Sequence, residues 1–252
     1  MVSQAKIRVK IIVFDQGNTL LLDPFPSVIE LRKNIFSKVF KNHGLSISSS
    51  LIASEWERSN KIVDYPFIGH FYQEEPIVQH ALRALGIKED IAAILALELL
   101  REYRIGLREV ISLDPRTQEV KRTLQELKAR GKKLAVFSND RAVALGLVLN
   151  VMGIKPLFQY VETSESFGVE KPSPLVFLKI LEHFSAMAET VAYVGDEPIK
   201  DIEAAKKQGF KAIQYKVNVD EYNEIWRDYQ RKSKYKPDAV ISRFSELLDI
   251  IE

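Results

Sequence analysis

The sequence predicts an α/β protein with a doubly wound parallel sheet and a helical domain inserted after the first strand. Two observations support this prediction. From residue 114 onward, short apolar runs alternate with helical patterns of about ten residues, which is typical of a parallel sheet covered on both faces. Between residues 23 and 113 the periodicity is helical, with few strand signals. We therefore expect a core domain formed by residues 1–22 and 114–252 and an α-helical domain formed by residues 23–113.

The composition excludes several kinds of site and partner. The chain has 252 residues, no cysteine and a formal net charge of +2. Without cysteine there is no disulfide, no thiolate catalysis and no Cys-ligated zinc, and the small net charge gives no basic field of the kind found in nucleic-acid binders. The N-terminus runs straight into the first strand, and the most apolar helical stretch, residues 91–100, is too short to span a bilayer. We expect a cytoplasmic protein with no nucleic-acid or membrane partner, and the sequence does not predict its oligomeric state.

Apolar spacing and capping residues place the elements along the chain. In the core domain, β-favouring apolar runs predict strands at residues 9–14, 133–137, 158–162, 191–194, 211–215 and 239–241. Between and after them, the pattern predicts helices at residues 115–130, 142–152, 174–184, 200–208, 219–232 and 245–251. In the inserted domain it predicts helices at residues 27–40 with Ser27 as N-cap, 50–63, 76–85 ending at Gly86, and 90–103.

Polar residues follow four of the predicted strands, and the carboxyl ends of parallel strands meet at one edge of a sheet. In chain order these residues are Asp15, Ser138, Asn139, Lys171, Asp196 and Asp201. Each has an alternative structural role: Ser138 as a helix N-cap, Lys171 as a surface charge and Asp201 as a charge at a helix N-terminus. Because such polar residues follow four strands that share one edge, a functional site is favoured over four separate structural roles.

These residue types suit a phosphate ester as substrate. Two carboxylates from adjacent strands can hold Mg²⁺, which prefers oxygen ligands and bridges to phosphate. The metal and Lys171 would neutralise the phosphoryl oxygens, which is most of the catalytic task in phosphoryl transfer. Ser138 would hold a further phosphoryl oxygen. A carboxylate such as Asp15 can itself attack phosphorus and form an aspartyl-phosphate.

The four loops resemble the motifs of the haloacid dehalogenase superfamily. They are Asp15-Gln16-Gly17-Asn18-Thr19, Ser138-Asn139, Lys171-Pro172, and Gly195-Asp196 with Asp201. The resemblance covers essentially the whole chain. It implies a Rossmann-like core, a mobile α-helical cap of the C1 type, and a Mg²⁺-dependent hydrolase, most simply a phosphatase acting on a small phosphomonoester.

The resemblance also implies a role for each motif residue. Asp15 would be the nucleophile and a magnesium ligand, Asp196 the second carboxylate ligand, and the backbone carbonyl of Gly17 a further ligand. Asp201 would support the water shell of the metal. The residues implied to act on the substrate are Ser138 and Lys171, which would be catalytic and bind phosphate, and Asn139, Asn18 and Thr19, which would bind substrate, with Thr19 orienting the first loop.

Gly17 departs from the family pattern. Phosphatases of the superfamily usually carry an aspartate at this position, which protonates the leaving group and then activates water. The loss of a general acid/base typically costs about 10²- to 10⁴-fold in rate. Three interpretations are open: another group, such as Asp140, Glu197 or a cap residue, supplies the proton; the enzyme is slow and suited to leaving groups that need no proton; or catalysis is lost and phosphate or protein binding is retained.

Two other branches of the superfamily are alternatives. The dehalogenases need no metal and typically carry a tyrosine at the position of Gly17, which this chain lacks. A phosphonatase-like reaction would need a cap lysine that forms a Schiff base, and nothing singles out one of Lys33, Lys38, Lys41 and Lys61.

Other residues carry weaker functional signals. The aromatic-rich residues 65–72 could line a specificity pocket or form the core between cap helices. The four histidines, His43, His70, His80 and His183, show no metal-ligand spacing. A local basic cluster at residues 231–236, with Tyr229 and Tyr235 interleaved, fits a solvated surface turn better than a nucleic-acid contact.

Overall fold

The computed structural model describes residues 6–64, 74–216 and 234–252. The chain divides into two compact units, one formed by Met1–Asp23 with Asp114–Glu252 and the other by Pro24–Leu113. We call them the α/β unit and the helical unit. In the described part of the chain, no helix has the length and apolar character needed to cross a membrane.

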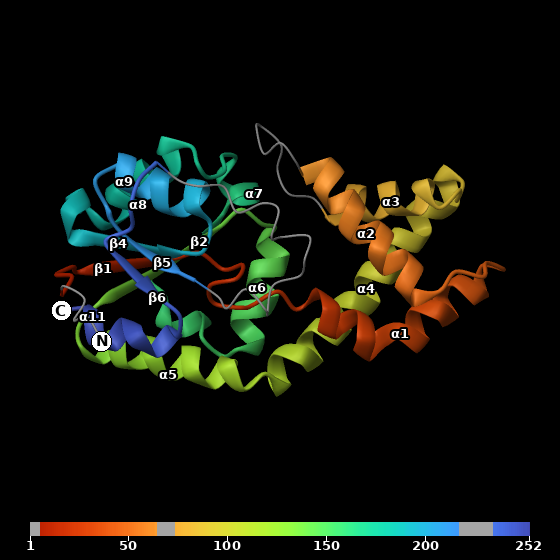
Figure 1. Ribbon diagram of the computed structural model, residues 1–252, viewed down its shortest axis with the longest axis horizontal. Coiled ribbons are helices and arrows are strands. Elements are labelled where there is room, and N and C mark those ends of the chain that lie inside the picture. The colour runs from red at the N-terminus through yellow and green to blue at the C-terminus, as the bar shows by residue number, and fades with distance from the viewer. Residues whose placement is uncertain (1–5, 65–73, 217–233) are drawn as a thin grey trace. The chain divides into compact units, whose positions relative to one another are not determined.

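The α/β unit contains a six-stranded sheet whose described strand pairs are all parallel, in the order β3-β2-β1-β4-β5-β6 (Figure 1). Its strands are β1 (Ile11–Phe14), β2 (Lys133–Ser138), β3 (Tyr160–Thr163), β4 (Val191–Gly195), β5 (Lys211–Tyr215) and β6 (Ala239–Ile241). This confirms the predicted doubly wound fold. Because β1 lies between β2 and β4, the chain order reverses at β1, and the carboxyl ends on either side of such a switch are where ligands bind in open α/β sheets.

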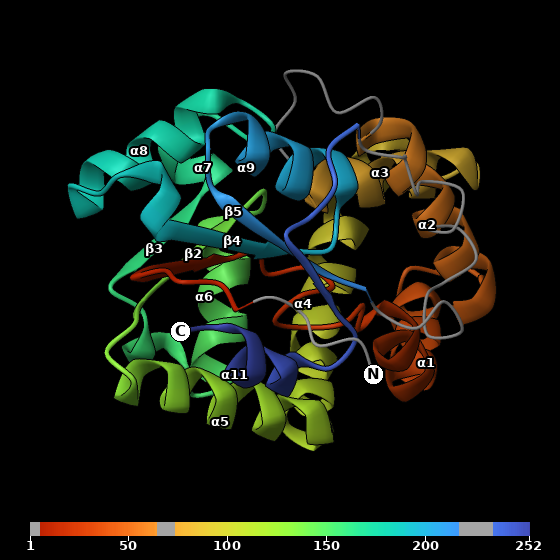
Figure 2. The same cartoon turned by 60° about the vertical axis from the view of Figure 1, so that its left-hand side comes forward.

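Helices cover both faces of this sheet. They are α5 (Pro115–Ala129), α6 (Ala142–Val151), α7 (Ser164–Phe167), α8 (Pro174–Phe184), α9 (Ala204–Lys207) and α11 (Leu247–Ile250). Figure 2 shows α8 and α9 on one face and α5 and α11 on the other. Helix α5 begins as its sequence predicts, since the Asp114 carboxylate accepts a hydrogen bond from the backbone N–H of Arg116 (2.9 Å) and Pro115 occupies the first position.

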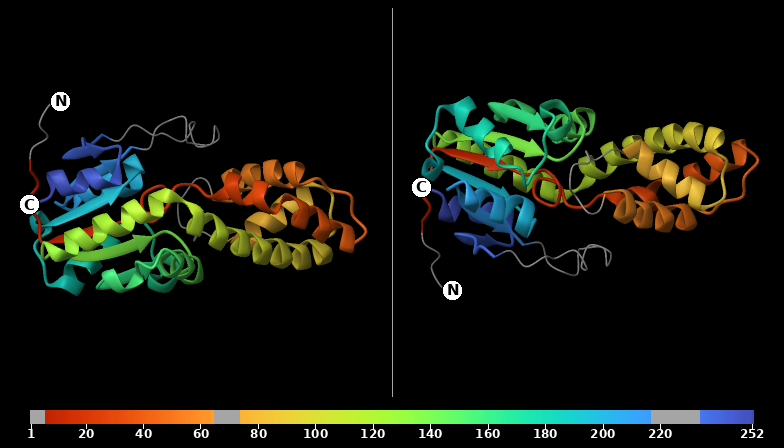
Figure 3. Two further views of the ribbon diagram at one scale, coloured as in Figure 1. Left: turned by 90° about the horizontal axis from the view of Figure 1, so that it is seen from below. Right: turned by 90° about the horizontal axis from the view of Figure 1, so that it is seen from above.

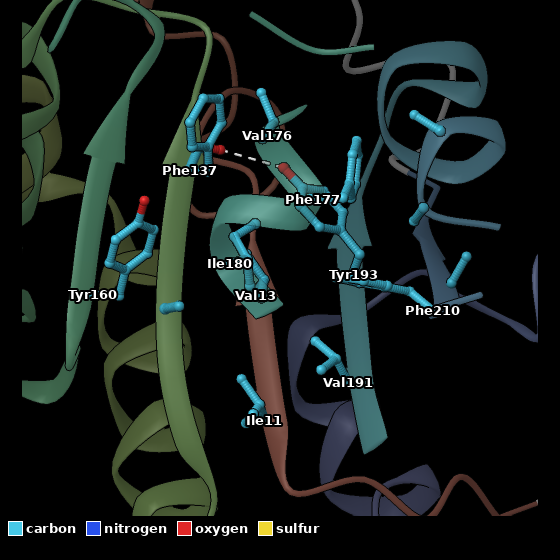
Figure 4. Packing of buried hydrophobic residues seen from close by; sticks show 14 of the residues in the cluster. Ile11, Val13, Phe137, Tyr160, Val176, Phe177, Ile180, Val191, Tyr193 and Phe210 are labelled. Atoms are coloured by element: carbon cyan, nitrogen blue, oxygen red, sulfur yellow. Dashed lines mark hydrogen bonds between the residues drawn. The ribbon is translucent and has the colours of Figure 1, made fainter. Parts of the chain in front are cut away.

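The core follows the two-residue period of the strands. Alternate residues of β1, β2 and β4, such as Val13, Phe137 and Tyr193, pack against α8 and α9 (Figure 4). The intervening residues of these strands are also buried. A sheet buried on both faces explains why the strands appear in the sequence as continuous apolar runs.

Two predictions for this unit need correction, and one short helix was missed. The helix expected at residues 200–208 is a π-helical stretch, Pro198–Glu203, followed by the single turn of α9. The final helix is split into a 3₁₀ turn, Phe244–Glu246, and α11, and α7 was not predicted. The expected helix at residues 219–232, and residues 231–233 of the basic cluster, lie outside the described residues.

The helical unit consists of α1 (Phe25–Asn42), α2 (Ser49–Asp64), α3 (Glu74–Ala84) and α4 (Glu89–Leu113). Figure 3 shows these helices packed alongside one another. Apolar side chains from all four form one core, which includes an aromatic group of Phe25, Trp56 and Tyr103 with ring centroids 5.3–5.8 Å apart. The aromatic stretch at residues 65–72, with His70, lies outside the described residues.

Two helix ends differ from prediction. Helix α1 begins at Phe25 with Pro24 in the cap position, so Ser27 lies inside the first turn and is not the N-cap. Helix α4 continues ten residues beyond the predicted end at Tyr103, through Gly106, to Leu113. A Cβ at Gly106 would lie 2.6 Å from Cγ of Arg32 and 2.9 Å from Cγ1 of Val28, both on α1. Close packing of α1 on α4 therefore requires glycine there, although glycine lowers helix propensity by about 1 kcal/mol.

Candidate active site

The carboxyl ends of β2, β1 and β4 bring the predicted site residues together. The register pairs Phe14, the last residue of β1, with Val136 of β2 and Val194 of β4. Asp15 and Asp196 directly follow their strands, and Ser138 ends β2. The structure therefore places these residues at one edge of the sheet, as the strand pattern predicts.

Lys171 lies at the centre of this edge. Its ammonium donates hydrogen bonds to Oδ1 of Asp15 (2.6 Å) and to Oδ1 of Asp201 (2.7 Å). It also lies 5.4 Å from the centre of the Tyr193 ring, within the range of a cation–π contact. The Lys171 residue is 2% exposed, so it is a buried counter-ion and not a surface charge.

Gly195 and the turn after β4 fix the position of Asp201. A Cβ at Gly195 would overlap the Asp201 side chain at 2.4 Å, so only glycine lets this carboxylate lie against the strand end. Oδ2 of Asp201 accepts a hydrogen bond from the backbone N–H of Glu197 (3.0 Å). With Oδ1 bound to Lys171, both carboxylate oxygens are held.

Three carboxylates form a group that could hold a metal ion. One oxygen each of Asp15, Asp196 and Asp201 lie within 4.8 Å of one another. The cluster contains three acidic side chains and one lysine, so it carries surplus negative charge when its carboxylates are ionised. Oxygen donors with surplus negative charge fit a hard divalent cation such as Mg²⁺.

Burial and neighbouring charges both shift the pKa values of this cluster. Burial raises the pKa of Asp15 from 3.8 to about 6, the charge of Lys171 opposes the rise and the charge of Asp201 adds to it. Burial alone would lower the pKa of Lys171, but the charges of Asp15 and Asp201 outweigh it and hold that pKa well above its usual value. Lys171 is therefore a permanent cation in this site.

The first loop is organised by its own backbone. The carbonyl of Gln16 accepts hydrogen bonds from the backbone N–H groups of Leu20 (3.0 Å) and Leu21 (3.1 Å). Asn18 has a φ of +48°, which asparagine tolerates better than most residues, and its Oδ1 accepts a bond from the backbone N–H of Asp23 (3.1 Å). The side chain of Asn18, predicted to bind substrate, thus closes the loop.

The other predicted substrate-binding residues lie around this loop. Ser138 is buried, with its Oγ 3.5 Å from Oε1 of Gln16. The hydroxyl of Thr19 is buried and has no hydrogen-bond partner among the described residues. The side-chain amide of Asn139 binds the backbone of Lys171.

The two carboxylates proposed as substitute acids have local partners. The Glu197 carboxylate accepts hydrogen bonds from the backbone N–H groups of Ile199 (2.7 Å) and Lys200 (2.6 Å). Burial nevertheless raises its pKa above the ordinary value. Asp140 accepts a bond from the backbone N–H of Arg141 (2.7 Å). Both side chains therefore form hydrogen bonds within the loops to which they belong.

Sequence reasoning missed two residues of this site, Gln16 and Tyr193. Tyr193 lies inside β4, and its hydroxyl donates to the carbonyl of Phe137 (3.3 Å; Figure 4). A hydroxyl-bearing aromatic two residues before Gly195-Asp196 is a signal that could have been noticed. Gln16 follows the candidate nucleophile, and its buried polar side chain is a similar signal.

Known proteins resemble this chain in sequence and fold. A glyceraldehyde 3-phosphate phosphatase of Methanocaldococcus jannaschii is 35% identical over 144 residues, which are 57% of this chain and 59% of that protein. One from Pyrococcus furiosus is 26% identical over 249 residues, covering 97% and 94% of the two chains. The crystal structure of a 2-haloacid dehalogenase from Pseudomonas syringae has a TM-score of 0.65 at 25% identity and covers 96% and 97% of the two chains.

The family assignment rests on more than half of the chain. Residues 73–215 match the sequence profile of the haloacid dehalogenase-like hydrolases. This range contains the loops of Ser138, Lys171, Asp196 and Asp201, and the structure joins them to Asp15 from the preceding segment. The chain belongs to the haloacid dehalogenase-like hydrolase family.

Proposed function

We propose that this protein is a Mg²⁺-dependent phosphatase that hydrolyses a small phosphomonoester through an aspartyl-phosphate. The observation that carries the proposal is the buried group of Asp15, Lys171 and Asp201, with Asp196 beside it, at the carboxyl edge of the sheet. This group provides a nucleophile, a fixed cation and an oxygen-rich place for a metal.

The proposal gives each of these residues a role. An oxygen of Asp15 attacks phosphorus, so that an O–P bond forms as the bond to the leaving oxygen breaks. The Lys171 ammonium stabilises negative charge on the phosphoryl oxygens, and the Ser138 hydroxyl donates to one of them. Water then attacks the aspartyl-phosphate, which releases phosphate and restores Asp15.

Asp15, Asp196 and the backbone carbonyl of Gly17 would hold Mg²⁺, and Asp201 would hold its water shell. The bound ion would supply positive charge for the phosphoryl group. The side chains present fit this role, because surplus carboxylate charge remains after Lys171 is paired.

The relatives suggest the substrate class. Two of them are named glyceraldehyde 3-phosphate phosphatase, and one from Aquifex aeolicus, 32% identical over 134 residues, is named phosphoglycolate phosphatase. We propose a phosphorylated metabolite of similar size as substrate. We also propose that residues 23–113 act as the cap that selects it.

The test is phosphate release from an aryl phosphate, whose leaving group departs with little need of a proton. We expect activity that requires Mg²⁺ and is abolished by Asp15→Asn, while Asp249→Asn, a carboxylate elsewhere in the α/β unit, leaves it unchanged. In parallel, Mg²⁺ should raise the melting temperature, and Asp196→Asn should reduce that rise. A folded protein that releases no phosphate under these conditions would refute the phosphatase.

The second candidate is a 2-haloacid dehalogenase, favoured by the structural similarity to one and by the absence of an acid at Gly17. Asp15 would then attack carbon and displace halide. Chloride release from 2-chloropropionate without metal would support it. The three-carboxylate group favours the phosphatase, because a displacement at carbon has no use for a metal site.

A further inference from the structure

Asn139 binds both polar groups of the Lys171 backbone. Its Oδ1 accepts a hydrogen bond from the Lys171 N–H (2.8 Å), and its Nδ2 donates to the Lys171 carbonyl (2.9 Å). A planar side-chain amide paired in this way fixes both the position and the direction of the backbone that it binds. In the described part of the chain, these are the only hydrogen bonds of the Lys171 backbone.

This contact links two segments that no strand pairing joins. Asn139 directly follows β2, whereas Lys171 lies 32 residues later, in the loop between α7 and α8. The loop leaves α7 at Gly168, whose φ is +79°. The amide of Asn139 therefore attaches the loop to the end of the central sheet.

The far end of the Lys171 side chain is fixed separately. Its ammonium is bound by the carboxylates of Asp15 and Asp201 and lies over the Tyr193 ring. The reach of a lysine side chain is limited, so the backbone position decides whether the ammonium can contact both carboxylates. Asn139 sets that position.

We propose that Asn139 is a positioning residue that acts through Lys171 and not through contact with the substrate. The proposal rests on the phosphatase function for its kinetic consequence, but its structural consequence is independent of that function. It replaces the substrate-binding role that the sequence predicts for Asn139.

The direct test observes the Lys171 ammonium by ¹H–¹⁵N NMR of the metal-free protein. A buried ammonium bound to two carboxylates exchanges its protons slowly with water, and the signal is assigned by its loss in Lys171→Met. In Asn139→Ala we expect its exchange to accelerate by about tenfold, the effect of losing two ordinary hydrogen bonds. Asn139→Asp keeps the shape of the side chain but loses the donor to the Lys171 carbonyl. It should show the same change, and it replaces the alanine variant if that variant folds poorly.

The matched control is Gln159→Ala. Oε1 of Gln159 accepts a bond from the backbone N–H of Leu134 (3.0 Å), so it also joins a side-chain amide to backbone of the same sheet, at the opposite end of β2. This variant should keep the slow ammonium signal. An unchanged signal in both Asn139 variants would overturn the proposal.

Kinetics with an aryl phosphate supply the second readout. We expect Asn139→Ala to lower kcat by about 10²-fold, the typical effect of a misplaced catalytic group, with a smaller change in KM. In the Lys171→Met background the same substitution should have no further effect on inorganic phosphate binding, whereas additive effects would contradict action through Lys171. If the wild type hydrolyses no phosphate ester, the proposed function fails and the NMR result still decides the role of Asn139.

Discussion

Two carboxylates in this molecule have the same low solvent exposure but pKa shifts of opposite sign. Asp15 in the α/β unit and Glu102 in the helical unit are each 7% exposed. The pKa of Asp15 is raised to about 6, chiefly by burial. Burial also acts to raise the pKa of Glu102, but hydrogen bonds and charge from Arg32 and Arg101 outweigh it and lower that pKa.

Asp15 is enclosed more deeply than Glu102, and the two groups also differ in the balance of charge around them. Glu102 has two arginine partners, Arg32 on α1 and Arg101 beside it. Asp15 shares a single lysine with Asp201 and has Asp196 nearby. The cluster of the helical unit is neutralised by the protein itself, as a structural ion pair must be. The cluster of the α/β unit has three carboxylates that could hold a metal ion, and Lys171 pairs with two of them.

The largest expected effect is a rise in the rate of hydrolysis when an acid is added beside Asp15. A Cβ at Gly17 would meet only Oδ2 of Asp15, at 3.9 Å, so the loop accepts a side chain there. Gly17→Asp should raise the hydrolysis of alkyl phosphates by about 10²- to 10⁴-fold by supplying a general acid/base. Gly17→Asn, which has the same shape but no acid, should not. Equal rates for both variants in a Mg²⁺-loaded assay would show that no acid is missing.

The next largest expected effect is the loss of stability when Glu102 loses its partner Arg32. Arg32→Met retains the apolar stem but leaves Glu102 buried with only the more exposed Arg101. We expect the free energy of unfolding of the helical unit to fall by about 3 kcal/mol, as for other broken buried ion pairs. Urea denaturation at pH 7 measures it. A change below about 1 kcal/mol would mean that this pair is not needed.

The ionisation of Asp15 should make the stability of the metal-free protein depend on pH. The pKa of Asp15 is about 6 in the folded state and near 3.8 in the unfolded state, so between these values the folded state binds more protons. The contribution of Asp15 to the free energy of unfolding should therefore fall as the pH rises from 4 to 6. Asp15→Asn should remove this fall and stabilise the protein at pH 7 by on the order of 2 kcal/mol. Urea unfolding in EDTA at pH 5 and 7 tests both statements, and a destabilised Asn variant would contradict them.

The smallest effect is expected for an exposed ion pair. Glu89, near the start of α4, pairs with Arg83 at 2.8 Å and has a side chain that is 78% exposed. Glu89→Gln should change the free energy of unfolding by less than about 0.5 kcal/mol. It is the natural control for Arg32→Met, because Glu89 and Glu102 lie on the same helix. If Glu89→Gln lowered the free energy of unfolding as much as Arg32→Met, burial would not explain the effect of Arg32→Met.

Much of the fold could be predicted because its signals are local. The apolar runs of β1, β2 and β4 and the polar residues that follow them specify strands and their ends, whatever the rest of the chain does. Since parallel strands share one carboxyl edge, the sequence also predicts that Asp15, Ser138 and Asp196 gather there. The departure of Gly17 from the family pattern is likewise visible in the order of residues alone.

Other features depend on contacts that the order of residues does not encode. Helix α4 passes through Gly106, where α1 leaves no room for a Cβ, although glycine usually indicates a helix end. Lys171 and Asp15 are 156 residues apart, and only the folded sheet shows that they form a buried pair. The same holds for the amide of Asn139, since a side chain with several possible partners binds the one that folding brings within reach.

The sequence by itself therefore determined most of the elements, the parallel sheet and the chemical types at its edge. The tertiary structure alone decided how charge is balanced among them, which side chains hold Lys171, and which of two carboxylates of equal solvent exposure is paired with arginines. The physical reason is that hydrophobic periodicity repeats along the chain, whereas electrostatic balance depends on distances between residues that are remote in sequence.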